Sequence, residues 1–276
     1  MRRIDGVDAP VRLAGLDPLA PVRATLRAAF QEGSPGSLAP ELVVGDATGW
    51  MCATSIADGT RLPELLASVA RSRRATPHAA AALAWKVYTY ALALPAVVGW
   101  ASARRVPLVR PADVLVRPGT PGAVLTLALR PSVRVAVLPA DPVAARRAGV
   151  EVAAGEAELL DALRAALLEA HLDPVLGHLR GTARLGARTL LGSLASGVAH
   201  AVLDAADVLP GSAAEHADVL LTALGVRDLV DLVPGPDGVV TVQRRTCCLA
   251  FTLPEAKICP SCCIRLRPPN GRRPFT

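Results

Sequence analysis

The stretch Arg244–Cys263 reads RRTCCLAFTLPEAKICPSCC and holds five of the six cysteines of this 276-residue chain. Cysteines that serve only as small apolar core residues are usually dispersed, whereas a dense group of thiols indicates metal or redox chemistry. The sixth cysteine, Cys52, lies far upstream and is expected to be an ordinary core residue. The pattern therefore predicts a metal–thiolate site in this stretch.

Two of the three explanations for such a cysteine group fit the spacing poorly. A disulfide framework is typical of short secreted chains with cysteines spread along them. A structural zinc site takes four tetrahedral ligands, usually from two Cys-x-x-Cys knuckles. Cys259 and Cys262 could form one knuckle. The adjacent pair Cys247 and Cys248 could not form the other, because neighbouring side chains on an extended segment point in opposite directions. Zinc is therefore the weaker alternative.

The third explanation is an iron–sulfur cluster of two irons and two sulfides, held by four thiolates. Such a cluster is larger than one ion, so thiolates can reach it from different directions, including two adjacent ones in a bent loop. The spacing Cys-Cys-x10-Cys-x2-Cys fits this demand with Cys247, Cys248, Cys259 and Cys262, and it differs from common ferredoxin spacings. The fifth thiol, Cys263, is either a small buried residue beside the site or an alternative ligand in place of Cys262.

Other residues of the same stretch complete a longer motif. Leu249, Phe251 and Leu253-Pro254 give the pattern Cys-Cys-Leu-x-Phe, Leu-Pro, Cys-x-x-Cys. This pattern resembles the FhuF-like ferric-siderophore reductases, and Trp85-Lys86-Val87-Tyr88 and the Arg-rich helix around Arg184 to Leu194 are more weakly similar to that family's middle region.

The resemblance implies that the four cysteines bind a [2Fe–2S] cluster. It also implies an enzyme, a ferric-chelate oxidoreductase that reduces siderophore-bound Fe(III) to Fe(II) in the cytoplasm and so releases the iron. The family often has proline after its last cysteine, where this chain has Cys263.

Composition narrows the class of protein. Apolar residues make up 51% of the chain and charged residues 20%, which argues against disorder, and 276 residues can bury a substantial core. The net charge of +6 is modest and aromatic residues are only 3%. Without a nucleic-acid-binding motif, these values give no support for a DNA or RNA partner.

Hydrophobic periodicity predicts an α+β fold that is mainly helical, a helical bundle with a small antiparallel β meander and a C-terminal iron–sulfur loop. Helices are expected at 18–30, 61–74, 77–103 and across 156–224, with a stop or bend at Asp173-Pro174. The β-prone runs are 114–116, 124–127, 133–137 and 239–242. We divide the chain into an N-terminal α+β region (1–150), a helical region (151–240) and a cluster-binding segment (241–276), together one compact unit. The best candidate for an internal boundary is Asp141 to Gly155.

The longest apolar stretch, Ala79 to Ala103, is long enough to raise the question of a membrane span. Lys86 and Pro95 interrupt it, so we expect a buried core helix, no membrane span and at most peripheral membrane contact. Arg2-Arg3 has no apolar run behind it and is not a twin-arginine signal. We therefore expect a cytoplasmic protein, where thiols stay reduced.

The chain lacks a Gly-x-Gly-x-x-Gly after a strand and a phosphate loop with Gly-Lys-Ser/Thr. Electrons would therefore come from an external donor such as a ferredoxin or flavoprotein. Positive charge near the cysteines could attract that donor or an anionic ferric siderophore, or could simply be a solvated rim. The candidate docking residues are Arg244, Arg245, Lys257, Arg265 and Arg267. Arg180, Arg184 and Arg188 recur every four residues and are expected to line one helix face, either solvated or facing an anionic ligand.

Two other functions remain open. One is a non-enzymatic binding or scaffold protein that is stapled by zinc or by a redox-silent cluster. The other is an iron–sulfur sensor whose cluster controls partner binding, although the chain shows no helix-turn-helix pattern.

Overall fold

The chain folds as an α+β, mainly helical protein with small sheets, as predicted. The computed structural model describes residues 17–30, 37–119, 123–146, 148–235, 238–253, 258–259 and 261–263. The α-helices are α1 (Ala20–Ala29), α2 (Thr54–Ala57), α3 (Leu62–Arg73), α4 (Pro77–Ala103), α5 (Glu156–Arg164), α6 (Asp173–Ala183), α7 (Ala187–Leu203) and α8 (Ala213–Ala223).

Nine short strands accompany these helices in the part of the chain that the structure describes. They are β1 (Leu38–Val43), β2 (Met51–Cys52), β3 (Arg105–Pro107), β4 (Val114–Pro118), β5 (Leu125–Leu129), β6 (Val135–Val137), β7 (Val150–Val152), β8 (Val230–Pro234) and β9 (Val240–Arg244). Short 3-10 turns are η2 (Pro111–Asp113), η4 (Ala206–Val208), η5 (Arg227–Leu229) and η6 (Ala250–Thr252), and η3 (Ala165–Leu172) is π-helical.

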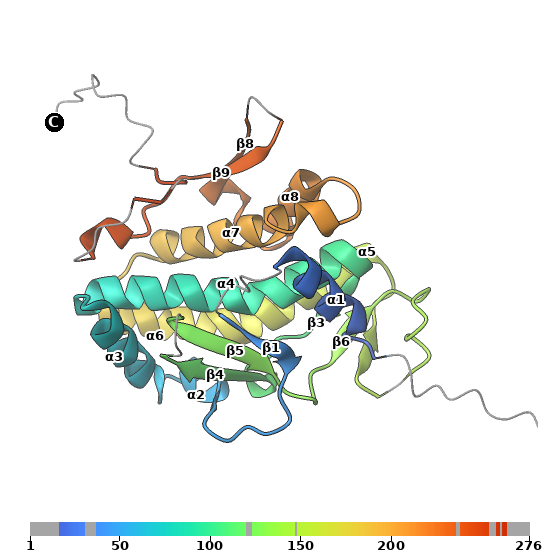
Figure 1. The fold of residues 1–276 in the computed structure, drawn as a ribbon, viewed down its shortest axis with the longest axis horizontal. Helices are drawn as coiled ribbons and strands as arrows, with labels where there is room; N and C mark the ends of the chain where they lie inside the picture. Colours follow the sequence, from blue (N-terminus) through green and yellow to red (C-terminus); the bar gives the residue numbers. More distant parts are fainter. Residues whose placement is uncertain are drawn as a thin grey trace, which may run out of the picture.

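The central helix is α4, which packs against α1, α3 and α7 (Figure 1). The Thr76 side chain caps its start by accepting a hydrogen bond from the Ala79 amide, and Pro77 occupies the first turn. Although α4 is long and apolar enough to cross a membrane, 78% of its most apolar window is buried inside the protein. This burial agrees with the expected core helix, and α4 continues without a break through Pro95.

The sheets require one correction to the expected meander. The first two β-prone runs pair as antiparallel β4 and β5, within the four-stranded sheet β1-β5-β4-β2. The third run, β6, instead lies between β3 and β7 in a separate sheet. Pro131 follows β5 and cannot donate to a β ladder, so the chain turns away and reaches the strand that leaves the end of α4.

The segment from Asp141 to Gly155 is not a domain boundary. Strand β6, which precedes this segment, pairs in parallel with β7, which lies within it. Asp141 also forms a nearly buried, two-pronged ion pair with Arg105, with distances of 2.7 and 2.9 Å. One hydrophobic core extends from Leu19 to Val242 and joins residues of the N-terminal and helical regions.

Two predicted helices end differently from expectation. Asp173-Pro174 neither stops nor separates the helices, because α5 continues through the π-helical segment η3 directly into α6. Arg180, Arg184 and Arg188 do not share one helix face. The helix ends at Ala183, Arg184 takes the left-handed conformation with φ of 52°, and α7 begins at Ala187.

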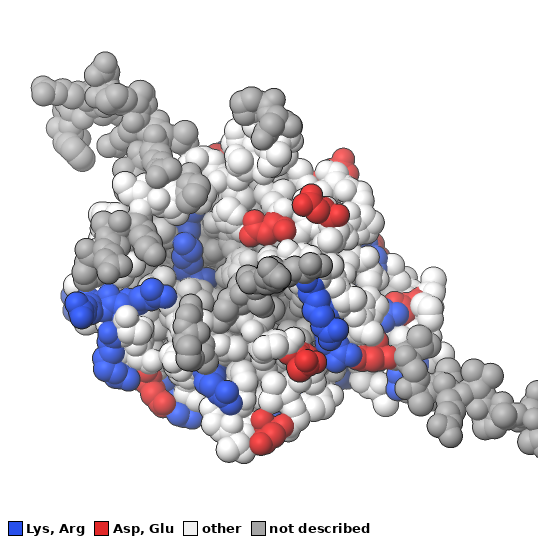
Figure 2. All heavy atoms as spheres, viewed as in Figure 1, with Lys and Arg blue, Asp and Glu red and all other residues white. Residues whose placement is uncertain are grey.

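The surface carries charges of both signs, unevenly distributed. Figure 2 shows Lys and Arg side chains gathered at the end of the molecule where α3 and the start of α4 lie.

A buried polar pair inside the core predicts a pH dependence of stability. The His171 ring is fully buried, with Nδ1 2.6 Å from the Val109 carbonyl oxygen and Nε2 2.5 Å from the Tyr88 hydroxyl. A carbonyl can only accept, so Nδ1 carries the hydrogen and Nε2 accepts from Tyr88. Burial lowers the pKa of His171 from 6.5 to about 4.

The unfolded chain therefore binds a proton between about pH 6.5 and pH 4 that the folded chain does not, and the free energy of unfolding falls as the pH falls through that window. The difference in pKa corresponds to about 3 kcal/mol. Urea unfolding at a series of pH values should show this loss in the wild type and a smaller loss in His171→Gln. Equal pH profiles for the two proteins would contradict the assignment.

Candidate metal–thiolate centre

A C-terminal hairpin delivers the cysteines to the helical core. Strands β8 and β9 pair from Val230 with Arg244 to Pro234 with Val240, and β9 contacts α7. The chain then runs along α7 toward the start of α4, where η6 contacts α4 (Figure 1). The Arg244 amide donates to the Ser261 carbonyl oxygen at 3.0 Å, which ties the end of β9 to the second cysteine group.

The structure brings the thiols of both cysteine groups together. The thiol of Cys248 interacts with that of Cys259, and the thiol of Cys263 lies near those of Cys247 and Cys262. Cys248 and Cys262 are buried, at 7% and 6% exposure, whereas the other three are half-buried. The two cysteine groups are therefore close enough to influence each other electrostatically, and their role as cluster ligands stays a prediction.

A bend at Leu249 turns backbone donors toward sulfur. Leu249 takes the left-handed conformation with φ of 60°, which is uncommon for a residue with a Cβ. Its amide lies 3.3 Å from Cys247 Sγ, and the Ala250 amide donates to the Cys248 sulfur. Hydrogen bonds from N–H groups stabilise the ionised form of a thiol. This is the bent loop that adjacent cysteine ligands require.

Three of these thiols, Cys248, Cys259 and Cys263, differ in how readily they ionise. Burial by itself raises the pKa of Cys248, but the Ala250 amide and the charges of Arg244 and Lys86 outweigh it, so the pKa is lowered overall. Burial, followed by the negative charge of Cys248, raises the pKa of Cys259. Burial and the neighbouring Cys247 and Cys262 raise the pKa of Cys263. Cys248 is therefore better prepared to ionise than Cys259 or Cys263.

Arg244 places a buried positive charge near the thiols. Its side chain is only 2% exposed, with Nη2 2.9 Å from Ser193 Oγ on α7 and Nε 3.3 Å from the Thr246 carbonyl oxygen. No described residue accepts a hydrogen bond from Nη1, and Thr246 Oγ1 is likewise buried without a partner among the described residues. Buried donors without acceptors are costly, so these two atoms are available to a partner beyond the described residues.

A thiolate-bound iron–sulfur cluster fits these features. It is anionic, so it would be stabilised by Arg244 and Lys86, and its sulfur atoms could accept from Arg244 Nη1 and Thr246 Oγ1. Within the described ranges, no three His, Cys, Asp or Glu side chains are grouped closely enough to hold a single metal ion.

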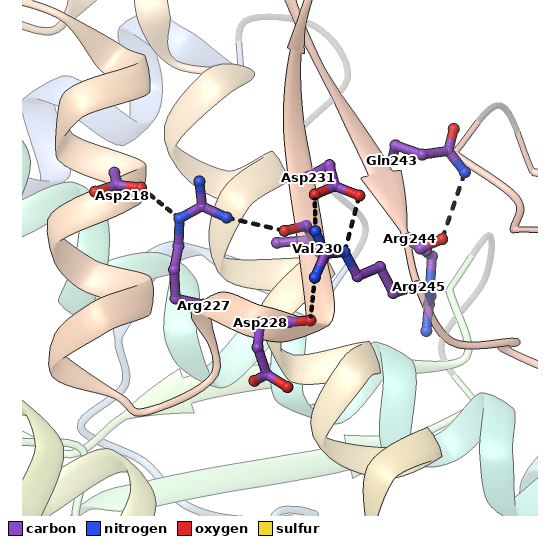
Figure 3. A network of polar contacts seen from close by, with 8 residues as sticks. All are labelled: Asp218, Arg227, Asp228, Val230, Asp231, Gln243, Arg244 and Arg245. Carbon is purple, nitrogen blue, oxygen red and sulfur yellow. Dashed lines mark hydrogen bonds and ion pairs between the residues drawn. The ribbon is translucent and has the colours of Figure 1, made fainter.

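The predicted docking residues fall into three situations. Arg244 is interior, so a partner at the surface cannot touch it. Arg245 is exposed but paired with the Asp231 carboxylate through bonds of 2.9 and 2.5 Å, and it also donates to the Asp228 carbonyl oxygen (Figure 3). This pairing lowers the pKa of Asp231. Lys257, Arg265 and Arg267 lie outside the described residues.

Two site residues were missed in the sequence. Lys86 on α4 acts electrostatically on both Cys248 and Cys259. Its signal was that one of only two lysines in the chain interrupts an apolar helix. Gly192 on α7 permits the close approach of the cysteine segment, because a Cβ added there would lie 1.9 Å from Thr246 Oγ1. No local pattern marks that glycine.

Cys52 takes no part in this centre. It is half-buried in β2, at the edge of the four-stranded sheet, and its sulfur lies 3.3 Å from Thr54 Oγ1. The sheet and the cysteine segment lie on opposite sides of α4 (Figure 1).

Comparisons with known proteins do not identify a family for this chain. No protein-family model matches it, and no curated protein matches it in sequence.

Proposed function

We propose that this protein is a cytoplasmic ferric-siderophore reductase that uses a [2Fe–2S] cluster held by Cys247, Cys248, Cys259 and Cys262. The observation that carries the proposal is the meeting of the two cysteine groups above the buried guanidinium of Arg244, whose Nη1 lacks a described partner. The resemblance of the cysteine motif to the FhuF-like reductases supplies the substrate class.

The cluster, when bound, would supply one-electron transfer between an external donor and the ferric chelate. Fe(II) binds hard oxygen ligands more weakly than Fe(III), so one-electron reduction labilises the chelate. Arg244 and Lys86 place positive charge beside the thiolates, which favours the more negative, reduced state and raises the potential. The amides of Leu249 and Ala250 support the same state by donating to sulfur.

The test is spectroscopic. Anaerobically purified protein should be reddish-brown, lose visible absorbance on reduction with dithionite and give a rhombic electron paramagnetic resonance signal after uptake of one electron. The reduced protein should then be reoxidised by ferric hydroxamate or catecholate siderophores, and a ferrous-specific chelator should trap the released Fe(II).

Redox-inactive gallium siderophores are the matched control, because they present the same ligand shell and should leave the reduced spectrum unchanged. A colourless protein with stoichiometric zinc after iron–sulfur reconstitution would contradict the proposal and favour a zinc-stapled scaffold. A genuine cluster that no ferric chelate reoxidises would contradict the reductase function alone.

A further inference from the structure

Five exposed arginines gather at one end of the molecule and are unlike most other arginines on its surface. Arg71 and Arg73 lie in the last turn of α3, and Arg74 caps that helix. Arg180 lies in the last turn of α6, and Arg184 caps α6. All five are exposed, and no described carboxylate pairs with any of them. We call this group the cationic end.

A hydrogen bond places the two helix ends side by side. His78, in the first turn of α4, lies 2.9 Å through Nδ1 from the carbonyl oxygen of Ala183, the residue before Arg184. Only three residues separate Arg74 from His78 in the chain. Figure 2 shows the resulting concentration of Lys and Arg side chains at this end.

The helices at this end carry few carboxylates. No Asp or Glu occurs between Glu64 and Asp113 or between Asp173 and Asp204, so most of α3, all of α4, most of α6 and all of α7 lack carboxylates. Elsewhere arginines are commonly paired, as Arg61 is with Glu64 and Arg188 with Asp228. A general preference for arginine does not explain why carboxylates are absent from two such long stretches of the chain.

The cationic end lies close to the thiols. Lys86, which acts on Cys248 and Cys259, is eight residues beyond His78 on α4, about 12 Å along the helix axis. The 3-10 turn η6 contacts α4 and carries Phe251, a large apolar side chain that is 44% exposed. An exposed apolar residue beside unpaired cations is typical of a protein interface with a polar rim.

We propose that the cationic end is the docking face for an acidic, one-electron donor protein of the ferredoxin or flavodoxin class. This inference rests on the proposed function, since it names the partner that delivers the electron. A protein partner is favoured over a small chelate because the guanidinium groups are spread over the ends of two helices, whereas small-molecule sites are concave and mostly apolar. Charge complementarity would steer the acidic partner toward the thiols.

The test measures binding and electron transfer separately, with an acidic [2Fe–2S] ferredoxin as the probe. Arg73→Glu and Arg180→Glu, alone and combined, are compared with Arg27→Glu, which replaces an exposed arginine of α1 and produces the same change in net charge as each single variant. At low ionic strength, the Kd for ferredoxin should rise about tenfold or more in the combined variant and stay near the wild-type value in Arg27→Glu. The difference should vanish at high salt.

Electron transfer should follow binding. The second-order rate of reduction by ferredoxin should fall in the combined variant, while photoreduction by neutral deazaflavin should be unchanged.

Equal ferredoxin affinity in the wild type and both kinds of variant would overturn the docking face, even if the protein reduces ferric chelates as proposed. Salt-sensitive loss of binding in a protein without a cluster would support the acidic-protein site and contradict the reductase. If the combined variant binds ferredoxin normally but is reoxidised slowly by ferric siderophore, the cationic end serves the chelate instead.

Discussion

Replacement of Cys248 with alanine is expected to reduce bound iron and sulfide at least about tenfold and to remove the visible absorbance. Cys248 is buried, interacts with Cys259, receives the Ala250 amide, and has a pKa that is lowered overall despite burial. The substitution removes the thiol that interacts with the second cysteine group. It also removes the negative charge that Cys248 would present to Arg244. Iron, sulfide and zinc content per chain, with circular dichroism to verify folding, measures the outcome.

Three companion variants locate the ligands. Cys52→Ala should keep full iron content, because the sheet that carries Cys52 lies across α4 from the cysteine segment. Cys262→Ala should lose iron more severely than Cys263→Ala, because Cys262 is the buried thiol of that pair. The reverse order would assign the fourth ligand to Cys263, and normal iron content in Cys248→Ala would contradict the whole ligand set.

Replacement of Gly192 with alanine should displace the cysteine segment and strongly reduce cluster content. Alanine favours the helical conformation by about 1 kcal/mol relative to glycine, so helix α7 alone would gain stability. The new Cβ would lie 1.9 Å from Thr246 Oγ1 and 2.8 Å from Thr246 Cβ, distances that non-bonded atoms do not adopt. Overpacking of this kind costs about 1–3 kcal/mol, and the segment Thr246–Cys248 is the part free to move. Iron content and thermal unfolding together measure the two effects.

The matched control is Gly177→Ala on α6, where no atom outside the glycine's own surroundings lies within 4 Å of the added Cβ. That variant should be more stable by about 0.4–1 kcal/mol and keep its cluster. Addition of Thr246→Ala to Gly192→Ala removes the closest atom and should restore part of the iron content. A Gly192→Ala protein with normal iron and raised stability would show that the contact does not position the cysteines.

Much of the fold could be predicted from the sequence because local signals agreed with the final packing. The apolar run after Thr76-Pro77 became α4, and the cysteine spacing predicted that two distant thiol groups would meet. The burial of Arg244 could also have been predicted from the alternation of side chains along a strand. Side chains alternate along a strand, so Arg244 shares a face with buried Val242, while Arg245 points outward.

Other features depend on contacts between distant residues. The partner strands of β6 are set by where α4 ends and by Pro131, not by the β-prone run itself. The four-residue spacing of Arg180, Arg184 and Arg188 indicated one helix face, but the left-handed residue Arg184 separates two helices. Lys86 approaches the cysteines only because α4 and η6 meet in space.

The hydrophobic core reaches its last buried member at Val242, just before the cysteines, in the part of the chain that the structure describes. Most of the core therefore comes from residues outside the thiol segment, unlike in a zinc finger, which is unfolded without its metal. On the proposed function, insertion of the cluster would then be a separate, late event in an already folded apoprotein. Loss of the proposed cluster by oxidation would return the chain to a reloadable apo form rather than to an unfolded one.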